Sequence, residues 1–498
     1  MENIISFQNL EVSPYIVEQL LDVRIDHQIN EHSTFYFKAL LPEEKKDSYA
    51  KDSSQGSNVS LLVRDSYGNS DILFQGMIQN VEIKSMQGTY YIEVYAISHS
   101  YLLDVEKKSR SFQNKKMPYS AIVQQVATDY EDAMIKDVVT QGAGIGQLIV
   151  QYKETDWEFI KRLASHFHTG IVNDVHFCYP RCYFGIPNNM KLALEISQYD
   201  VKKNSAKYLK LSKSGISGLQ EQDFIYYQIE TYLPANIGDE VQFQGHTLYV
   251  CQIKGRMDKG IFMHHLTLTT KKGMSQLYQG HDRIAGVSLN AKIVEIQNDQ
   301  VKVSLKIDEA SGHAPGELCF FPYSTIYSSQ DGSGWYCMPE IGDQVRIYFP
   351  DNIEEHSYAI SSVHEEVNQQ SGDTLYSDGI NGGTSVNGKP EIVGNYSGRR
   401  DDPSVKSIRN KDGKEIRLTP DGIYIIADGT VITLTDNGGI SITSDQNIEF
   451  KSDHSIILSA EEDVSIIGQV GIDLSCNETA SIKIEENIEV VGQEIKSN

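Results

Sequence analysis

Five residues of metal-ligand type lie close together in one segment of the chain: His166, His168, His176, Cys178 and Cys182. Zinc binds histidine nitrogen and cysteine sulfur, so these residue types would suit a metal site. However, His166 and His168 lie at the expected end of a helix, and the spacing of the cysteines, with Pro180 between them, is not that of a zinc ribbon. We therefore predict no metal and no cofactor, and metal binding by this segment stays an open alternative.

Carboxylate pairs, which could serve acid–base catalysis, occur as neighbours in the sequence, at Glu365-Glu366 and Glu461-Glu462. Adjacent residues on a strand point to opposite faces, so the two members of each pair cannot act on one substrate. The sequence also has no Gly-x-Ser-x-Gly elbow and no phosphate-binding glycine loop with lysine. We predict that the protein is not an enzyme.

The formal net charge of the 498 residues is −24, which argues against binding to nucleic acid, because that needs a basic surface. Six cysteines are sparse for this length and unpatterned, which is typical of a protein made in a reducing compartment. No apolar run is long enough to span a bilayer, and the start of the chain does not read as a signal peptide.

The most regular stretch of the chain runs from Ile416 to Val490 with a period of eight residues. Each octad has two apolar positions, two residues apart, which form two columns along the repeat. In the second octad these positions are Tyr424 and Ile426. Residues i and i+2 of a strand share a face, so each octad is expected to be a short strand and a turn with one apolar pair to bury. The predicted core of this segment is Ile416, Leu418, Ile432, Leu434, Ile440, Ile442, Ile448, Phe450, Ile456, Leu458, Val464, Ile466, Ile472, Leu474, Ile482, Ile488 and Val490.

An isolated octad strand cannot bury its apolar pair, so the strands must stack. A single chain could coil with three octads per turn, or three chains could each supply one face of a common prism. An ordinary β-sandwich is a third alternative. The periodicity by itself leaves all three open.

The sequence pattern of the rest of the chain predicts strands and a few helices. Up to about residue 275 we expect strands at 58–63, 72–82, 90–98, 224–233, 240–253 and 261–270, with a turn at Gln87-Gly88. A helix is expected after Pro118, and a second after Thr155, which with Glu158 has the form of a capping box. A second group of strands is expected at 287–294, 300–307 and 343–349.

Three motifs in the first segment carry a resemblance to a known family. They are Phe74-Gln75-Gly76-Met77-Ile78, Ser111-Phe112-Gln113-Asn114-Lys115, and Gln151-Tyr152-Lys153-Glu154-Thr155-Asp156-Trp157-Glu158-Phe159. Together they resemble the hub of VgrG proteins, the spikes of type VI secretion systems, which are similar to the hub and needle proteins of contractile phage tails. The stretch from Gly334 to Val345 is similar to the barrel that follows the hub in that family, and 406–413 resembles the lead-in to its needle.

The resemblance implies a mainly β fold with five parts. These are a β-rich α+β hub at 1–275, an OB-fold collar at 281–365, a Ser/Gly/Asn/Asp-rich connector at 366–411, a triple-stranded β-helix or prism formed by a trimer at 412–492, and a tail at 493–498. It also implies the function of a trimeric spike and baseplate hub in a contractile injection machine. An envelope-degrading hydrolase or a tail fibre with a β-solenoid stalk is the alternative.

The expected partners are two further copies of the chain, tube and baseplate proteins, effector cargo, and a small PAAR-like protein on the tip, but not nucleic acid. The end of the octad segment, at Ile488, Val490 and Ile495, is the expected contact for the tip protein. Assembly in the bacterial cytoplasm, followed by expulsion with the injection particle, is the location that the resemblance implies.

Overall fold

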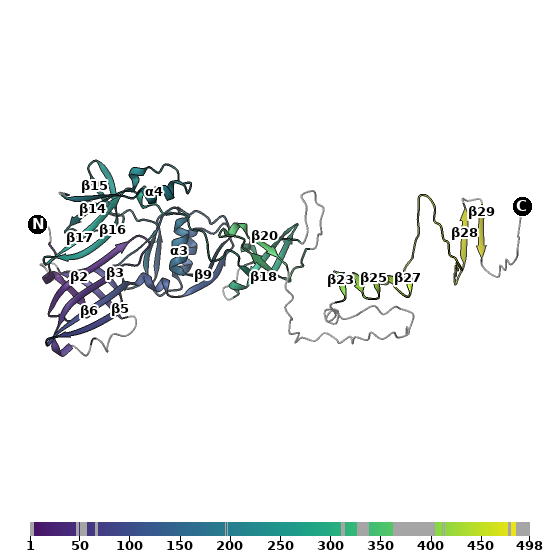
Figure 1. Ribbon diagram of the computed structural model, residues 1–498, viewed down its shortest axis with the longest axis horizontal. Helices are drawn as coiled ribbons and strands as arrows, with labels where there is room; N and C mark the ends of the chain where they lie inside the picture. The colour runs from purple at the N-terminus through teal and green to yellow at the C-terminus, as the bar shows by residue number, and fades with distance from the viewer. Residues whose placement is uncertain are drawn as a thin grey trace. The chain divides into compact units, whose positions relative to one another are not determined.

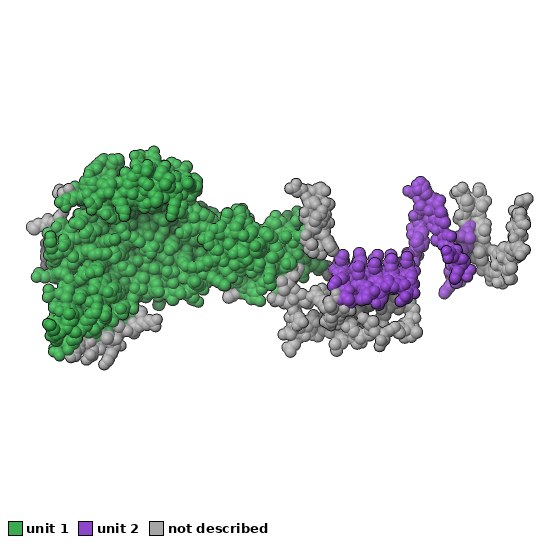
Figure 2. Space-filling view, in the orientation of Figure 1, with its two compact units in different colours: residues 1–366 green, residues 367–498 purple. Residues whose placement is uncertain are grey.

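The computed structural model describes residues 4–45, 49, 57–64, 68–194, 196, 198–309, 314–325, 338–361, 404–410, 412, 414–476 and 480–484. The chain divides into two compact units, residues 1–366 and 367–498 (Figure 2). Strands, nearly all paired antiparallel, predominate over helices in the described residues, which confirms the predicted mainly β fold class.

A twelve-stranded sheet dominates the first unit (Figure 1). Its main path runs β1 (Leu10–Ser13), β4 (Asn58–Arg64), β5 (Ser70–Met86), β6 (Thr89–Ser98), β3 (Thr34–Leu41), β2 (Gln19–Gln28), β16 (His246–Asp258), β17 (Ile261–Thr269), β14 (Ile225–Thr231) and β13 (Tyr199–Lys203), with β15 (Glu240–Phe243) and β12 (Lys191–Leu192) beside β16. The turn predicted at Gln87-Gly88 is present, with both residues at positive φ. The strand predicted at 240–253 is instead a hairpin, because Gln244 and Gly245 have φ of 49° and 78° and turn the chain.

Two helices and two small sheets lie between the halves of this large sheet in sequence, and a third described helix lies between β13 and β14. The helices are α2 (Tyr119–Ala127), α3 (Asp156–Ser165) and α4 (Ser205–Ser212), and the last was not expected from the sequence. One small sheet pairs β7 (Lys107–Phe112) with β9 (Ile149–Thr155), and the other contains β10 (Ile171–Asn173), β11 (Arg181–Phe184) and β8 (Met134–Asp137). The apolar faces of α2 and α3 are buried in one cluster, in which Ile122, Trp157 and Ile160 are almost inaccessible.

A second, five-stranded sheet ends the first unit. Its order is β20 (Phe320–Pro322), β19 (Gln300–Leu305), β18 (Ser288–Gln297), β21 (Gln344–Tyr348) and β22 (Tyr358–Ile360). A bridge between Tyr323 and Ala359 joins its two end strands, so the sheet closes on itself. Its core also takes in Leu148 and Val150 from around β9, so this sheet, called the collar below, shares apolar contacts with the preceding part of the unit. Gly334 to Cys337, part of a motif that the sequence singled out, lie outside the described residues.

The second unit begins with an antiparallel meander, in which each strand pairs with its neighbours in sequence (Figure 1). Its strands are β23 (Lys406–Arg409), β24 (Glu415–Thr419), β25 (Gly422–Ala427), β26 (Thr430–Thr435) and β27 (Gly439–Ser444). Residues 445–471 are described but contain no strand, and β28 (Ile472–Cys476) then pairs with β29 (Ala480–Ile484). The octad pattern therefore forms strands over only part of its length within one chain, because a strand needs a hydrogen-bonded neighbour.

The register of the meander corrects the predicted apolar columns at one octad. Ile416 lies opposite Ile425, which lies opposite Ile432, so these three side chains share a face. Tyr424 and Ile426, which the period of eight placed with them, are on the other face. The reason is that the turns after β24 and β25 have two residues each, and every such turn exchanges odd for even positions on a given face.

Candidate functional site: the junction motif and the aliphatic face

The stretch 152–158, called the junction motif below, connects β9 to α3, and its capping box is present as predicted. The Thr155 backbone N–H donates to Glu158 Oε2 at 3.1 Å, and the Glu158 N–H donates to Thr155 Oγ1 at 3.1 Å. These bonds satisfy amides that the first turn of a helix otherwise leaves without partners. The local sequence therefore fixes where α3 begins, and with it the direction of the side chains that follow.

Glu154 of the junction motif forms a buried ionic cluster with α3 and the collar. Arg162 donates to both oxygens of Glu154 at 2.9 Å and to Glu354 Oε1 at 2.9 Å, and all three side chains are buried. Burial raises the pKa of Glu154, although Arg162 opposes this effect. His281 lies 3.5 Å from Glu154 and accepts from the Tyr152 N–H, and burial lowers its pKa to about 3. The cluster ties α3 to the 3-10 helix η8 (Glu354–His356), which precedes the last collar strand.

Asp156, the first residue of α3, is fully buried and is surrounded by donors. Lys108 reaches its Oδ2 at 2.7 Å, and Arg110 reaches its Oδ1 at 2.6 Å. Tyr130 also donates to Oδ2 at 2.7 Å, and burial together with this bond raises the pKa of the tyrosine. A buried carboxylate is tolerated when it is paired in this way, so Asp156 joins β7 and α2 to the start of α3.

Further polar contacts join the hub side to the collar side. Arg283 binds both oxygens of Glu158, at 2.5 and 2.6 Å, and holds the pKa of that carboxyl at about 2. The backbone and hydroxyl of Ser111 donate to Asp308 at 2.7 and 2.6 Å, and both residues are buried. The charged side chains of this cluster, called the clamp below, are paired with one another and join α3 and β7 to residues around the collar strands.

A Ser–His–Asp set, which sequence reasoning did not find, lies beside the junction motif. His32 Nδ1 is 2.8 Å from Ser100 Oγ, and its Nε2 is 3.3 Å from Asp104 Oδ2. Ser100 is only 2% exposed, and its hydroxyl also contacts Ser98, so it is not accessible as a nucleophile. The His32 ring packs against Trp157 of the junction motif at 4.1 Å, which indicates a packing role. No sequence signal could have found this set, since folding brings together residues far apart in the chain.

The structure does not gather the five residues of metal-ligand type into one site. His166 contacts the Tyr119 hydroxyl at 2.9 Å, and His168 follows in the turn after α3. His176 contacts Asp174 at 2.8 Å, Cys178 is exposed, and Cys182 is buried in β11, where burial raises the pKa of its thiol. Among the residues that the structure describes, no group of three or more His, Cys, Asp or Glu is arranged to hold a metal ion.

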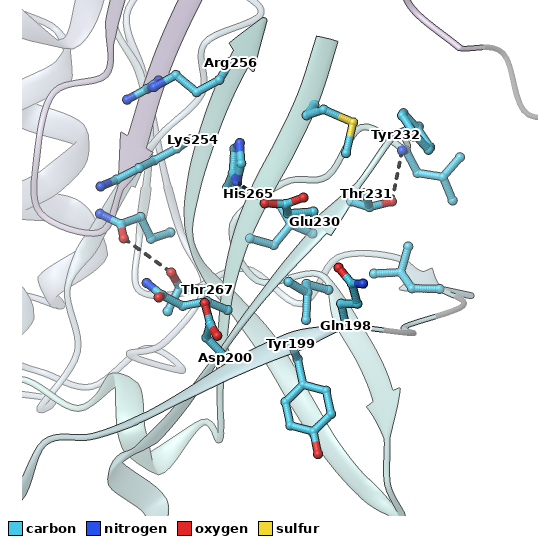
Figure 3. A pocket seen from close by; sticks show the side chains of 17 residues that line it. Gln198, Tyr199, Asp200, Glu230, Thr231, Tyr232, Lys254, Arg256, His265 and Thr267 are labelled. Atoms are coloured by element: carbon cyan, nitrogen blue, oxygen red, sulfur yellow. Dashed lines mark hydrogen bonds and ion pairs between the residues drawn. The ribbon is translucent and has the colours of Figure 1, made fainter. Parts of the chain in front are cut away.

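A shallow groove of about 900 Å³ crosses the outer face of β13, β14, β17 and β16 (Figure 3). Charges of both signs line it, and some are paired, as for His265 and Glu230 at 3.3 Å. Arg256 points away to Asp26 at 2.6 Å. Figure 3 shows Asp200, Lys254 and Thr267 among the side chains of the lining, so the groove is a mainly polar surface of the sheet.

Comparison with known proteins agrees with this geometry. Residues 27–172 match the family model of the phage tail baseplate hub. This part of the chain has the phage tail baseplate hub fold. Strands β3, β4, β5 and β6 of the large sheet and the junction motif lie within the matched segment, which we call the hub. Among curated protein sequences, none matches the chain.

Solved structures extend the likeness beyond the hub. An E. coli protein described as a component of the type VI secretion system, with similarity to the T4 phage tail proteins gp27 and gp5, aligns with a TM-score of 0.50 at 13% identity and covers 71% of this chain and 99% of its own. A chain of the Francisella PdpA–VgrG complex in its half-lidded form aligns with a TM-score of 0.50 at 9% identity, over 85% of this chain and 83% of that one. At these identities the comparison shows the fold, and the predicted resemblance to VgrG and phage hub proteins is confirmed at that level.

The second site is an apolar surface of the meander, called the aliphatic face below. The pairing register places on it Ile408, Ile416, Leu418, Ile423, Ile425, Ile432, Leu434, Ile440 and Ile442. Ile423 and Ile425 were missed from the sequence, because the period of eight selected Tyr424 and Ile426 instead. The face is open: Ile416 is 43% exposed and Ile440 is 72% exposed.

The remaining predicted core residues continue this exposure. Ile448, Phe450, Ile456, Leu458, Val464 and Ile466 lie in the segment without strands and are exposed. Ile472 and Leu474 lie in β28 and Ile482 in β29. Ile488, Val490 and Ile495, the predicted tip contact, lie outside the described residues, as does most of the predicted connector. In the described part of the second unit, apolar side chains thus gather at the surface, which is typical of an interface.

Proposed function

We propose that the protein is the trimeric central spike and baseplate hub of a contractile injection machine. The observation that carries this proposal is the combination, in one chain, of a baseplate-hub fold with a repeat segment whose aliphatic face is uncovered. The fold supports a hub or spike role by itself. The uncovered face supports the trimer, because each fully buried Ile or Leu side chain contributes about 2 kcal/mol.

The strand register favours three chains over a one-chain coil. A coil with three octads per turn would bring Ile416 beside Ile440. The observed neighbours of Ile416 are instead in adjacent octads and run antiparallel, so each chain forms one flat sheet. Three such sheets can close a prism with their aliphatic faces inward, while Glu415 and Arg417, which pair at 2.9 Å, lie on the other face.

The proposed partners follow from this role. They are tube and baseplate proteins around the hub, effector cargo, and a small PAAR-like protein on the end of the needle, at Ile488, Val490 and Ile495. The Francisella structure is that of a VgrG in complex with PdpA, which supports the idea that spikes of this fold carry another protein. In this proposal the chain is assembled in the bacterial cytoplasm and leaves with the particle.

The chain does not act as an enzyme in this proposal. The buried carboxylates around the junction motif are paired with Arg162, Lys108 and Arg110, and Ser100 is inaccessible. The rival functions are an envelope-degrading hydrolase and a tail fibre. Among the described residues, no helix is long and apolar enough to cross a membrane.

Light scattering of the purified full-length protein tests the trimer, since a stable particle near the chain mass of 55.9 kDa would contradict it. Electron microscopy of the assembled particle tests the position on its axis. A pull-down that compares the full chain with one truncated after Glu485 tests the tip protein, which should be lost on truncation. Clearing of cell-wall substrate, abolished by one Asp or Glu substitution, would favour the hydrolase instead.

A further inference from the structure

The meander and the segment after it behave differently although they share one sequence repeat. Within a single chain, residues 406–444 form a continuous hydrogen-bonded sheet of five strands. Residues 445–471 carry the same apolar columns but form no strand, and Phe450 and Leu458 are 70% and 72% exposed. The two parts differ in charge, since residues 406–444 hold five acidic and five basic residues, whereas residues 445–471 hold six acidic residues and one lysine. They also differ at the turn positions of their octads.

The turns of the meander explain why it forms without a partner. Asp428-Gly429 is a two-residue hairpin turn, and Gly429 has φ of 69°, a value that suits glycine. Pro420-Asp421 makes the other two-residue turn, and Gly438 donates to Thr435 Oγ1 at 3.1 Å in the turn that follows β26. Within 445–471, the stretches at the turn positions of the octads have no paired strands on either side. In a hairpin with a favourable turn, the backbone is already ordered before the chains associate. Much of the conformational entropy of its strands is therefore lost on folding of the single chain.

The turns of the meander also decide whether odd-numbered or even-numbered residues lie on the aliphatic face of each strand, which we call the phase of the repeat. Two turns of two residues exchange odd and even positions, and these exchanges cancel by β26. The three-residue turn between Thr435 and Gly439 then leaves even-numbered residues on the aliphatic face, as Ile440 and Ile442 show. Ile448, Phe450 and the later predicted core residues are also even-numbered, so a needle that continues from β27 keeps one phase.

From these observations we infer that the needle assembles in order: the aliphatic faces of three chains meet first at residues 406–444, and the octads after Ser444 form strands only afterwards, in the register fixed by that contact. The inference rests on the proposed trimeric function and adds to it a seeding surface and a direction. The occupant of the aliphatic face is the same face on two further copies of the chain. An uncovered face with Ile and Leu at nearly every position, on a sheet that is already folded, loses less conformational entropy on association than an extended segment does.

Two full-length variants test the order of assembly. Ile432→Asp places a carboxylate in the seeding face, and Ile456→Asp places one in the segment without strands. After refolding from denaturant, we expect the trimer yield of Ile432→Asp to fall at least tenfold, and that of Ile456→Asp to fall less than twofold. Limited proteolysis with mass spectrometry should then find the Ile456→Asp trimer cut within 445–471 and intact within 406–444.

The control is Thr433→Asp, on the opposite face of β26 and next to Ile432, which should trimerise like the unchanged protein. Equal loss of trimer in both core variants, or a larger loss in Ile456→Asp, would overturn the seeding role of 406–444 while the unchanged protein remained a trimer. An unchanged protein that is itself a monomer would instead contradict the proposed function, so the two failures are distinguishable.

Discussion

The two units differ in how far their apolar side chains are buried. In the first unit, strands and helices enclose four clusters of apolar side chains, and residues such as Phe37, Phe159 and Phe349 are inaccessible. In the described part of the second unit, the buried hydrophobic residues are Ile426 and Val431, whereas Ile and Leu side chains of the aliphatic face stay open. A sheet buries its apolar face within its own chain only when another layer of that chain covers it. The first unit thus completes its core alone, whereas the exposed face of the second supports the proposal that its core is shared between chains.

The two units also differ in how far their ion pairs are exposed. The first unit buries Glu154, Asp156 and Glu354 and pairs each with a cation. The described part of the second unit buries one such carboxylate, Glu415, which pairs with Arg417. Its Glu449 and Lys451 instead pair at 2.6 Å on the surface, with side chains that are 67% and 80% exposed. Buried pairs fix one arrangement of the elements that carry them, whereas exposed pairs contribute little stability. The paired charges of the junction motif therefore hold α3, β7 and the collar in one arrangement.

The largest expected effect tests whether the second unit depends on other chains. In Ile448→Asp, three carboxylates would meet in one dry layer of the trimer, and each costs several kcal/mol unless it is protonated. We expect the trimer to lose its heat resistance by light scattering and calorimetry. Asn447→Asp adds the same charge at the adjacent polar position and should change little. Equal heat resistance of the two variants would show that the octad frame is wrong.

A smaller effect is expected when the clamp of the first unit is broken. Glu354→Ala leaves Arg162 buried with one carboxylate partner fewer, and such a loss costs about 3–5 kcal/mol. The urea midpoint of the first unit should fall accordingly, while the mass of the trimer stays the same. Glu355→Ala, at the next position and exposed, is the matched control. If both variants unfold at the same urea concentration, the buried cluster does not stabilise the junction.

The smallest effect concerns acid. Burial lowers the pKa of His27 and of His264 to about 4. His176 also lowers the pKa of His27, whereas Asp174 raises it. His265 likewise lowers the pKa of His264. Because the ordinary value of about 6.5 applies to the unfolded chain, that state binds more protons between about pH 6.5 and 4. The free energy of unfolding should therefore fall as the pH falls through this range, by up to about 3 kcal/mol for each histidine.

Urea midpoints of the first unit at about pH 7, 5 and 4 measure this slope. His264→Gln should flatten it, whereas His246→Gln, which changes an exposed histidine of β16, should not. A slope unchanged by His264→Gln would mean that this histidine does not carry its share of the acid sensitivity.

Local patterns in the sequence determined the elements that short-range chemistry controls. The capping box at Thr155 and Glu158, the turn at Gln87-Gly88 and strands β18, β19 and β21 of the collar depend on residues close together in the chain, and the structure has them there. Strands β20 and β22 of the collar were not predicted. The mainly β class and the hub likeness followed from such patterns and from the motifs. The octad period likewise identified most of the aliphatic face.

Only the tertiary structure decided the contacts between distant residues. The pairing of Arg162 with Glu354, and of Ser111 with Asp308, depends on how the collar closes against α3 and β7, which no spacing encodes. The same holds for the phase of the second octad, since turn length and hydrogen-bond register, rather than the period, set whether Tyr424 or Ile425 lies on the aliphatic face. A repeat in sequence fixes which residues are apolar, but the face on which each one lies depends on the strand it pairs with.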